Sequence, residues 1–189
     1  MEGSLKTNPL AIVFGGVPLG SEYRLAYELM TGSKQSQMIS FSAIRITPLI
    51  PIYQNQNSGR DLRFILKGFR FQYMYRYFFR KWDKAPEGWY TGPVFSYATG
   101  RLSIHNYLIR QRYIEFHNGY FCMAIGNQRK LFGRVVSDMF FGLGYKQNRI
   151  NEHFTSGALQ PFKLGDDEFV QYYLSPVKIC FGWNIGFLF

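Results

Sequence analysis

The segment Phe69-Arg70-Phe71-Gln72-Tyr73-Met74-Tyr75-Arg76-Tyr77-Phe78-Phe79 decides the fold class, because an aromatic residue stands at every second position from 69 to 79. Arginine, glutamine, methionine and one phenylalanine stand between these aromatic residues. A period of two, kept over eleven residues, is typical of a β-strand whose two faces meet different surroundings. One face of this strand is bulky and apolar, and the other is largely polar.

Three other segments repeat this pattern, which indicates that it describes the whole fold rather than one strand. Bulky residues alternate with small or polar ones over residues 22–29, 137–145 and 177–189. The faces opposite the bulky residues carry glycines, small side chains and charges. This combination suits a narrow polar interior better than an apolar core.

The composition favours a membrane barrel over soluble classes. The chain has 189 residues with 19 Phe, 14 Tyr and 19 Gly, while charged residues make up only 18% and leave a net charge of +10. A soluble barrel would need many charges outside, and six large aromatics from one strand would overfill a small one. We therefore predict a single domain, residues 1–189, that folds as an all-β, eight-stranded antiparallel up-and-down transmembrane β-barrel.

Turn signals divide the chain into eight expected strands, near residues 5–14, 20–30, 37–48, 63–80, 88–98, 111–125, 132–146 and 172–189. Short polar breaks are predicted at 31–34, 84–88 and 126–130, and longer connections at 48–63, 99–111 and 147–168. An even strand number places both termini at the end of the barrel that carries the short turns.

Two sets of residues follow from the alternation. The lipid-facing set comprises Phe69, Phe71, Tyr73, Tyr75, Tyr77, Phe79, Phe181, Trp183, Ile185 and Phe187. The polar lumen set comprises Glu22, Arg24, Glu28, Arg70, Arg76, Arg80, Asp138 and Lys178. Because unpaired charges in a narrow interior cost several kcal/mol each, we expect the lumen set to form a paired network that plugs the barrel and leaves no open pore.

The same assignment makes predictions for substitutions. Tyr73 or Phe181 changed to Arg near the membrane midplane is expected to cost about 2–4 kcal/mol. Polar residues in place of Gly182 or Asn184, on the inner face, are expected to do less harm.

The sequence offers little catalytic chemistry. Ser103 lies two residues from His105, and Ser156 lies three from His153; a Ser–His pair could serve a lipid acyl hydrolase. His117 is the third histidine, and nothing in the sequence marks a third triad member or an oxyanion hole. We therefore expect no enzyme, and no metal or cofactor site either, since Cys122 and Cys180 are too few and too far apart for a zinc site.

Several short motifs resemble small outer-membrane β-barrel proteins of Bacteroidota with a DUF3575-like domain. They are Lys6–Leu10, Phe14–Leu19, Glu22–Arg24, Ala85–Pro93 and Asp138–Tyr145. The final Phe189 is similar to the carboxy-terminal signal by which such barrels reach their insertion machinery. The resemblance implies an eight-stranded barrel in the bacterial outer membrane with no established chemistry. The signal peptide expected of such a protein is missing from residues 1–4.

The functional hypothesis is a structural or accessory subunit of a larger outer-membrane complex for protein export, insertion or nutrient uptake. Expected partners are outer-membrane lipids and lipopolysaccharide, the barrel-insertion machinery and other outer-membrane proteins. Nucleic acid is not expected, because the aromatic residues alternate along strands instead of forming stacking patches. The alternatives are an outer-membrane lipid-modifying enzyme and a soluble calycin-like ligand-binding barrel.

Overall fold

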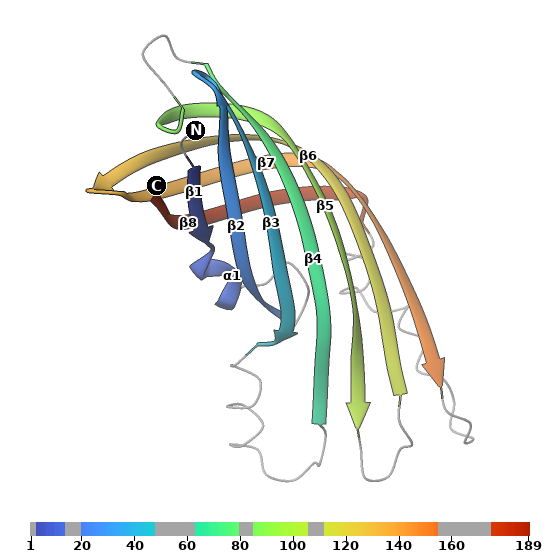
Figure 1. Ribbon diagram of the computed structural model, residues 1–189. Coiled ribbons are helices and arrows are strands. Elements are labelled where there is room, and N and C mark those ends of the chain that lie inside the picture. The colour runs from blue at the N-terminus through green and yellow to red at the C-terminus, as the bar shows by residue number, and fades with distance from the viewer. Residues whose placement is uncertain (1–2, 14–19, 48–62, 80–84, 106–111, 155–174) are drawn as a thin grey trace.

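The computed structural model describes residues 3–13, 20–47, 63–79, 85–105, 112–154 and 175–189, which form one closed barrel of eight strands (Figure 1). Every strand pairs antiparallel with its sequence neighbour, and the first pairs with the last. This confirms the predicted all-β, eight-stranded, up-and-down barrel. The elements are β1 (Gly3–Thr7), α1 (Pro9–Val13), β2 (Gly20–Gly32), β3 (Gln35–Ile46), β4 (Arg63–Phe78), β5 (Gly88–His105), β6 (Arg112–Phe132), β7 (Val135–Phe154) and β8 (Val177–Leu188).

The first and last described residues lie together at the end of the barrel that carries the short turns (Figure 1). Gly3 and Phe189 exchange backbone hydrogen bonds of 3.1 and 3.0 Å. The β2–β3 turn falls at Ser33 and Lys34, inside the predicted break at 31–34. The β6–β7 turn uses Gly133 with a positive φ of 54°, a conformation that glycine adopts without steric cost. The other end of the barrel is the one at which the sequence predicts the longer connections, and we call it the long-loop end.

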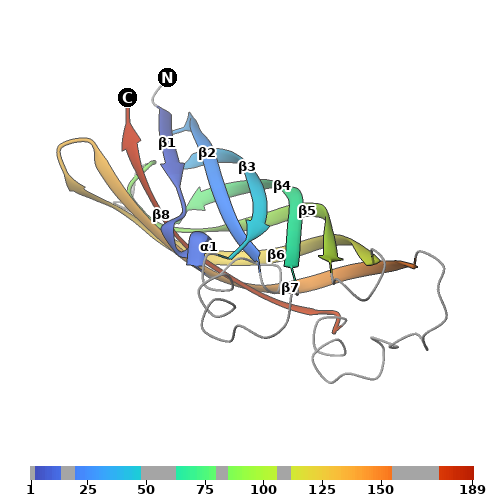
Figure 2. The ribbon, with the colours of Figure 1, turned by 90° about the horizontal axis from the view of Figure 1, so that it is seen from below.

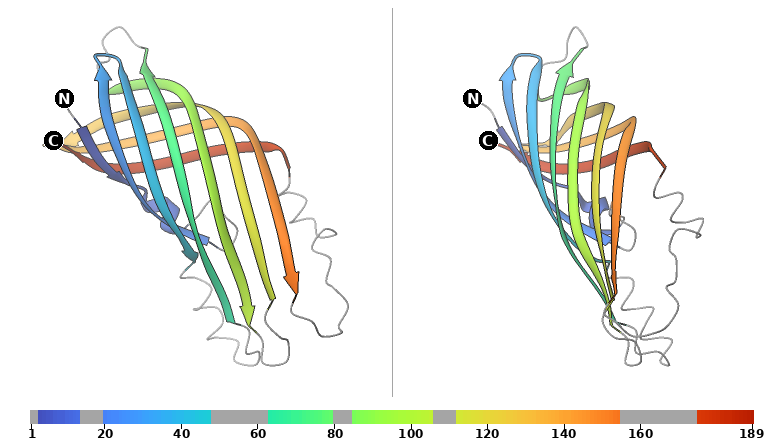
Figure 3. Two further views of the ribbon diagram at one scale, coloured as in Figure 1. Left: turned by 45° about the vertical axis from the view of Figure 1, so that its right-hand side comes forward. Right: turned by 90° about the vertical axis from the view of Figure 1, so that its right-hand side faces the viewer.

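The barrel closes along β1, whose ladder with β8 runs from Ser4–Leu188 to Thr7–Ile185. Views from below and from two sides show the strands tilted and curved around the barrel, and α1 lies next to the end of β1 (Figures 2 and 3). Side chains alternate between the outside and the lumen, as the burial pattern of β3 and β8 shows. A barrel of eight strands has a lumen just wide enough for the inward-facing side chains to fill.

The first strand is shorter than predicted, because β1 ends at Thr7 instead of continuing to residue 14. Asn8 caps the short helix that follows, with its Oδ1 accepting a hydrogen bond of 3.0 Å from the Ala11 N–H. Pro9 then occupies the first helical position, where its missing N–H costs nothing. Within the described ranges, no helix is long or apolar enough to cross a membrane.

The predicted turn at residues 126–130 is wrong, because β6 continues to Phe132. The expected loops at 99–111 and 147–168 are also partly strand, since β5 reaches His105 and β7 reaches Phe154. Pairing with the neighbouring strands keeps these stretches in β-structure. The opposed residues Arg101 and Glu115, for example, form an ion pair of 2.7 Å. Strands β4 to β7 consequently extend beyond β2 and β3 at the long-loop end (Figure 1).

Candidate functional site

The outer face of the barrel carries a belt of large apolar side chains. The structure places the whole predicted lipid-facing set on this face. Phe181 is 64% exposed and Phe69 is 56% exposed, whereas Tyr73, Tyr75, Trp183 and Ile185 are half-buried among their neighbours. Phe189 is also exposed and stacks beside Tyr27, with ring centroids 6.1 Å apart.

The height of this belt matches a bilayer. Its outward positions run over ten residue steps on three strands, namely 69–79, 135–145 and 177–187. At about 3.3 Å per residue, each run is about 33 Å long. A tilt of about 40° reduces this length to a height of about 25 Å, which is the height of the apolar band in transmembrane barrels.

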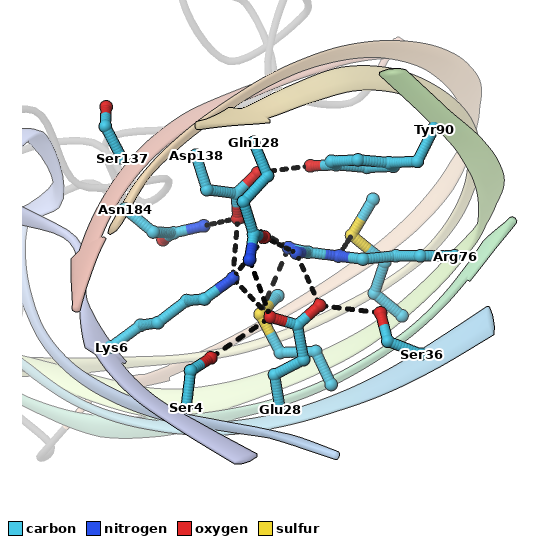
Figure 4. A network of polar contacts seen from close by, with 12 residues as sticks. Ser4, Lys6, Glu28, Ser36, Arg76, Tyr90, Gln128, Ser137, Asp138 and Asn184 are labelled. Atoms are coloured by element: carbon cyan, nitrogen blue, oxygen red, sulfur yellow. Dashed lines mark hydrogen bonds and ion pairs between the residues drawn. The ribbon is translucent and has the colours of Figure 1, made fainter. Parts of the chain in front are cut away.

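A network of charged side chains closes the lumen at the short-turn end (Figure 4). Glu28 lies 2.6 Å from Lys6 Nζ and 3.0 Å from Arg76 Nη1. Asp138 lies 2.6 Å from Arg76 Nη2 and 3.4 Å from Lys6 Nζ. We call these four residues and their polar partners the plug. All four side chains are fully buried, and two cations face two carboxylates, so the charges of the plug balance.

Gln128 links the two halves of the plug. Its Oε1 accepts hydrogen bonds from Lys6 at 2.6 Å and from Arg76 at 2.8 Å, and its Nε2 donates to Glu28 at 3.2 Å. Sequence reasoning missed Gln128, because the polar run around it predicts a turn. It also missed Lys6, which lay in a predicted strand but outside the alternating segments.

Uncharged side chains also donate hydrogen bonds to the two carboxylates of the plug. Asp138 accepts hydrogen bonds from the Tyr90 hydroxyl at 2.5 Å and from Asn184 Nδ2 at 3.0 Å. Glu28 accepts bonds from the hydroxyls of Ser4 and Ser36 (Figure 4). A buried ion network stabilises a fold only if its polar atoms are satisfied, and this plug meets that condition almost completely.

A second charged group lies farther along the lumen. Glu22 forms one ion pair of 2.8 Å with Arg70 and another of 3.0 Å with Arg24. These three side chains line a cavity of about 260 Å³, together with Gln72, Tyr120, Lys178 and parts of α1 and β8.

The predicted lumen set thus separates into two groups. Glu28, Arg76 and Asp138 belong to the plug, and Glu22, Arg24 and Arg70 meet at the cavity. Lys178 also lines the cavity, with Nζ 5.2 Å from the centre of the Tyr120 ring, but it makes no ion pair within the described residues. Arg80 lies outside the described residues.

Two inner-face positions are less tolerant than the sequence indicates. A Cβ added to Gly182 would lie 2.5 Å from the ring of Phe140. Asn184 is buried and donates to Asp138 in the plug. Polar substitutions at these two positions are therefore expected to destabilise the barrel, and that they do less harm than an arginine on the outer face stays a prediction.

The residues considered for hydrolysis are not assembled in the described part of the chain. His117 lies in β6, and its Nδ1 is 3.1 Å from both Tyr97 Oη and Thr99 Oγ1. Ser156 and the side chains of His105 and His153 lie outside the described residues. Among the described residues, no three histidines, cysteines or acidic residues gather as a metal site would require.

A closed eight-stranded antiparallel barrel with an apolar belt and a lumen that a buried charged plug closes defines the class: the chain has the fold of an outer-membrane β-barrel protein. It is similar to the crystal structure of a major outer membrane protein from Thermus thermophilus, with a TM-score of 0.56 and 10% sequence identity over 100% of this chain and 99% of that one. No protein-family model and no curated protein sequence matches the chain. The resemblance to Bacteroidota proteins therefore stays a prediction.

Proposed function

We propose that this chain is an integral outer-membrane barrel without an open channel, which acts as a structural or accessory subunit of a larger outer-membrane complex. The observation that carries the proposal is the inversion of polarity across one sheet. Apolar residues such as Phe181 face out, whereas Arg76 and Asp138 are fully buried inside. A soluble calycin-like barrel requires the opposite arrangement.

The plug argues against conduction through the barrel. Its ion pairs join β1, β2, β4 and β7 across the full width of the lumen (Figure 4). Opening a path for water or solute would separate Arg76 from its two carboxylates. Because a buried charge that loses its partner is strongly destabilising, the plug favours a static barrel over a gated one.

The accessory role is supported by the polar outer face of β5, β6 and β7 beyond the belt. There Arg101 pairs with Glu115 and stacks over Tyr113, with its guanidinium 4.4 Å from the ring centre. A shallow depression of about 440 Å³ lies nearby, over Gly119 and beside Arg149. Side chains of this kind suit lipopolysaccharide head groups or a neighbouring protein rather than hydrocarbon. Passage through the barrel-insertion machinery and an origin in Bacteroidota are part of the same proposal, and no enzymatic activity is included.

The first test is insertion. The full chain, refolded into vesicles of outer-membrane lipids, is expected to show heat-modifiable migration on a gel and protection of its strands from protease. A protein that stays monomeric in buffer without detergent would overturn the proposal in favour of a soluble barrel.

The second test concerns the accessory role. Mild-detergent extraction of native membranes is expected to recover the chain with stoichiometric partners, and the variant Arg101→Glu is expected to reduce their recovery. Arg129→Glu, an exposed residue at the short-turn end, serves as the matched control. Recovery of a solitary protein would remove the accessory role but leave the membrane barrel in place.

A further inference from the structure

Beyond the end of β1, no strand among the described residues bridges β2 and β8. β1 pairs with β2 only from Gly3–Leu29 to Lys6–Ala26, and its last pair with β8 is Thr7–Ile185. Residues 20–25 of β2 and 177–184 of β8 therefore have no strand partner on this side among the described residues. The helix α1 packs against both strands at this position (Figures 1 and 2).

The helix α1 contacts β2 and β8 through apolar side chains and not through a ladder of backbone hydrogen bonds. Its sequence, Pro9 to Val13, contains no polar side chain, and Val13 is 45% exposed. The Ser21 hydroxyl donates to the Ile12 carbonyl, whereas a paired strand would make a ladder of backbone hydrogen bonds. The apolar segment α1 therefore packs against the parts of β2 and β8 that β1, which ends at Thr7, does not reach.

The cavity lies directly behind α1. Asn8 and Ala11 line it on the side of α1. Residues of β8 line it as well, both inward-facing ones such as Cys180 and outward-facing ones such as Phe181. Because residues of both faces of β8 line it, the cavity reaches the open edge of that strand. Its volume of about 260 Å³ lies just below the range of about 300–1,000 Å³ for small-molecule sites, which suits a head group rather than a whole lipid.

The cavity carries an excess of positive charge. Arg24, Arg70 and Lys178 line it against the single carboxylate of Glu22, whereas the plug holds two cations and two carboxylates. An uncompensated buried cation is costly, and a bound anion removes that cost.

Unused hydrogen-bond donors lie at the same place. Arg70 is only 3% exposed, yet its Nε and Nη2 have no acceptor among the described residues. Gln72 is 2% exposed, and its Nε2 also lacks an acceptor there, although its Oε1 accepts from Tyr120 at 3.3 Å. Two nitrogens of one guanidinium form the fork that binds a carboxylate or phosphate in a bidentate manner.

We propose that this cavity binds the anionic head group of a single-chain amphiphile, with the hydrocarbon tail leaving the barrel past α1 between β2 and β8. Arg70 is the principal ligand of the head group, and Lys178 and Gln72 contact it from the sides. Carboxylate and phosphate head groups share the required chemistry. The inference rests on the proposed membrane location, because the bilayer supplies the amphiphile.

The experiment measures binding of dodecyl phosphate and of laurate to the full chain folded in dodecyl maltoside, by titration calorimetry and native mass spectrometry. One molecule is expected to bind per barrel. Arg70→Met and Lys178→Met are each expected to weaken binding at least about tenfold. Lys178→Met removes no ion pair of the described residues, so the barrel is expected to fold even if Arg70→Met does not.

Arg129→Met is the matched control, because Arg129 is an exposed arginine at the short-turn end, away from the cavity, where its Nε donates to Asn127 Oδ1 at 2.8 Å. Affinity unchanged in this control supports the cavity as the site. Equal weakening in all three variants, or equal binding of dodecyltrimethylammonium, would show partitioning without a site and overturn the proposal.

Binding of inorganic phosphate tests whether the anion reaches the cavity from the bilayer or from solution. Binding of inorganic phosphate as tight as that of dodecyl phosphate would overturn the lateral route and indicate a soluble anion. Heat-modifiable migration is recorded for every variant. A barrel that inserts into vesicles but binds neither amphiphile refutes this inference alone, whereas a chain that does not insert refutes the proposed function.

Discussion

Replacement of Arg76 by Met is the sharpest test of the plug, because it removes one charge and leaves the surrounding lumen almost unchanged in volume. The variant loses ion pairs of 3.0 Å to Glu28 and 2.6 Å to Asp138. It also loses a hydrogen bond of 2.8 Å to Gln128. Lys6 then remains as the only cation of the plug beside two buried carboxylates.

The expected loss can be worked from these contacts. Removing one partner of a buried ion pair costs about 3–5 kcal/mol, because the other charge stays buried without compensation. Arg76 has two such partners, but Lys6 still neutralises Glu28 at 2.6 Å, so Asp138 carries most of the penalty. We therefore expect Arg76→Met to lower the free energy of unfolding by about 3–5 kcal/mol.

The assay is urea unfolding in lipid vesicles, followed by tryptophan fluorescence and by migration on a gel. Arg101→Met serves as the control, because its ion pair is exposed and is expected to contribute about 1 kcal/mol or less. Combining Arg76→Met with Asp138→Asn should recover part of the loss, since the isolated carboxylate is then removed. Equal losses for Arg76→Met and Arg101→Met would refute a dry, coupled network.

Three other predictions concern the belt, the packing of the lumen and conduction. Phe181→Arg is expected to cost about 2–4 kcal/mol in vesicles, whereas Phe181→Leu should cost much less; equal losses in the same unfolding assay would contradict a lipid-facing position. Gly182→Ser is expected to cost about 1–3 kcal/mol, because the new Cβ would lie 2.5 Å from the Phe140 ring, and a neutral result would show that Phe140 moves aside. In planar bilayers the protein should show no conductance steps, while the double variant Arg76→Ala and Asp138→Ala should show small ones; steps from the unchanged protein would disprove a closed lumen.

The class of fold and the side-chain faces could be predicted from the sequence because alternation is a local property. A strand places successive side chains on opposite faces whatever its partners are. The local sequence of residues 69–79 and 177–187 is therefore enough to predict which side chains share a face. The turn at Ser33 and Lys34 was likewise predicted from the short polar break between two strands.

The ends of β5, β6 and β7 could not be predicted in the same way. At the long-loop ends of β5 and β6 the outward residues become polar while apolar residues such as Leu102 and Phe116 face inward, and the end of β7 is largely polar on both faces, so the pattern of the belt does not continue there. Only pairing with a neighbouring strand makes them β-structure, as for Arg101 opposite Glu115. Gln128 was misplaced for the same reason, although it lies at the centre of the plug.

By itself, the sequence determined that the chain forms strands with apolar side chains outside and charged ones inside. Tertiary structure alone decided which charges meet: Lys6 reaches Asp138 across 132 residues of sequence because the closed ring brings β1 next to β8, and β8 next to β7. It also decided that two arginines share Glu22, and that α1 replaces a strand beside the cavity. The period of a strand is set within a few residues, whereas the stagger of a closed barrel depends on every strand at once.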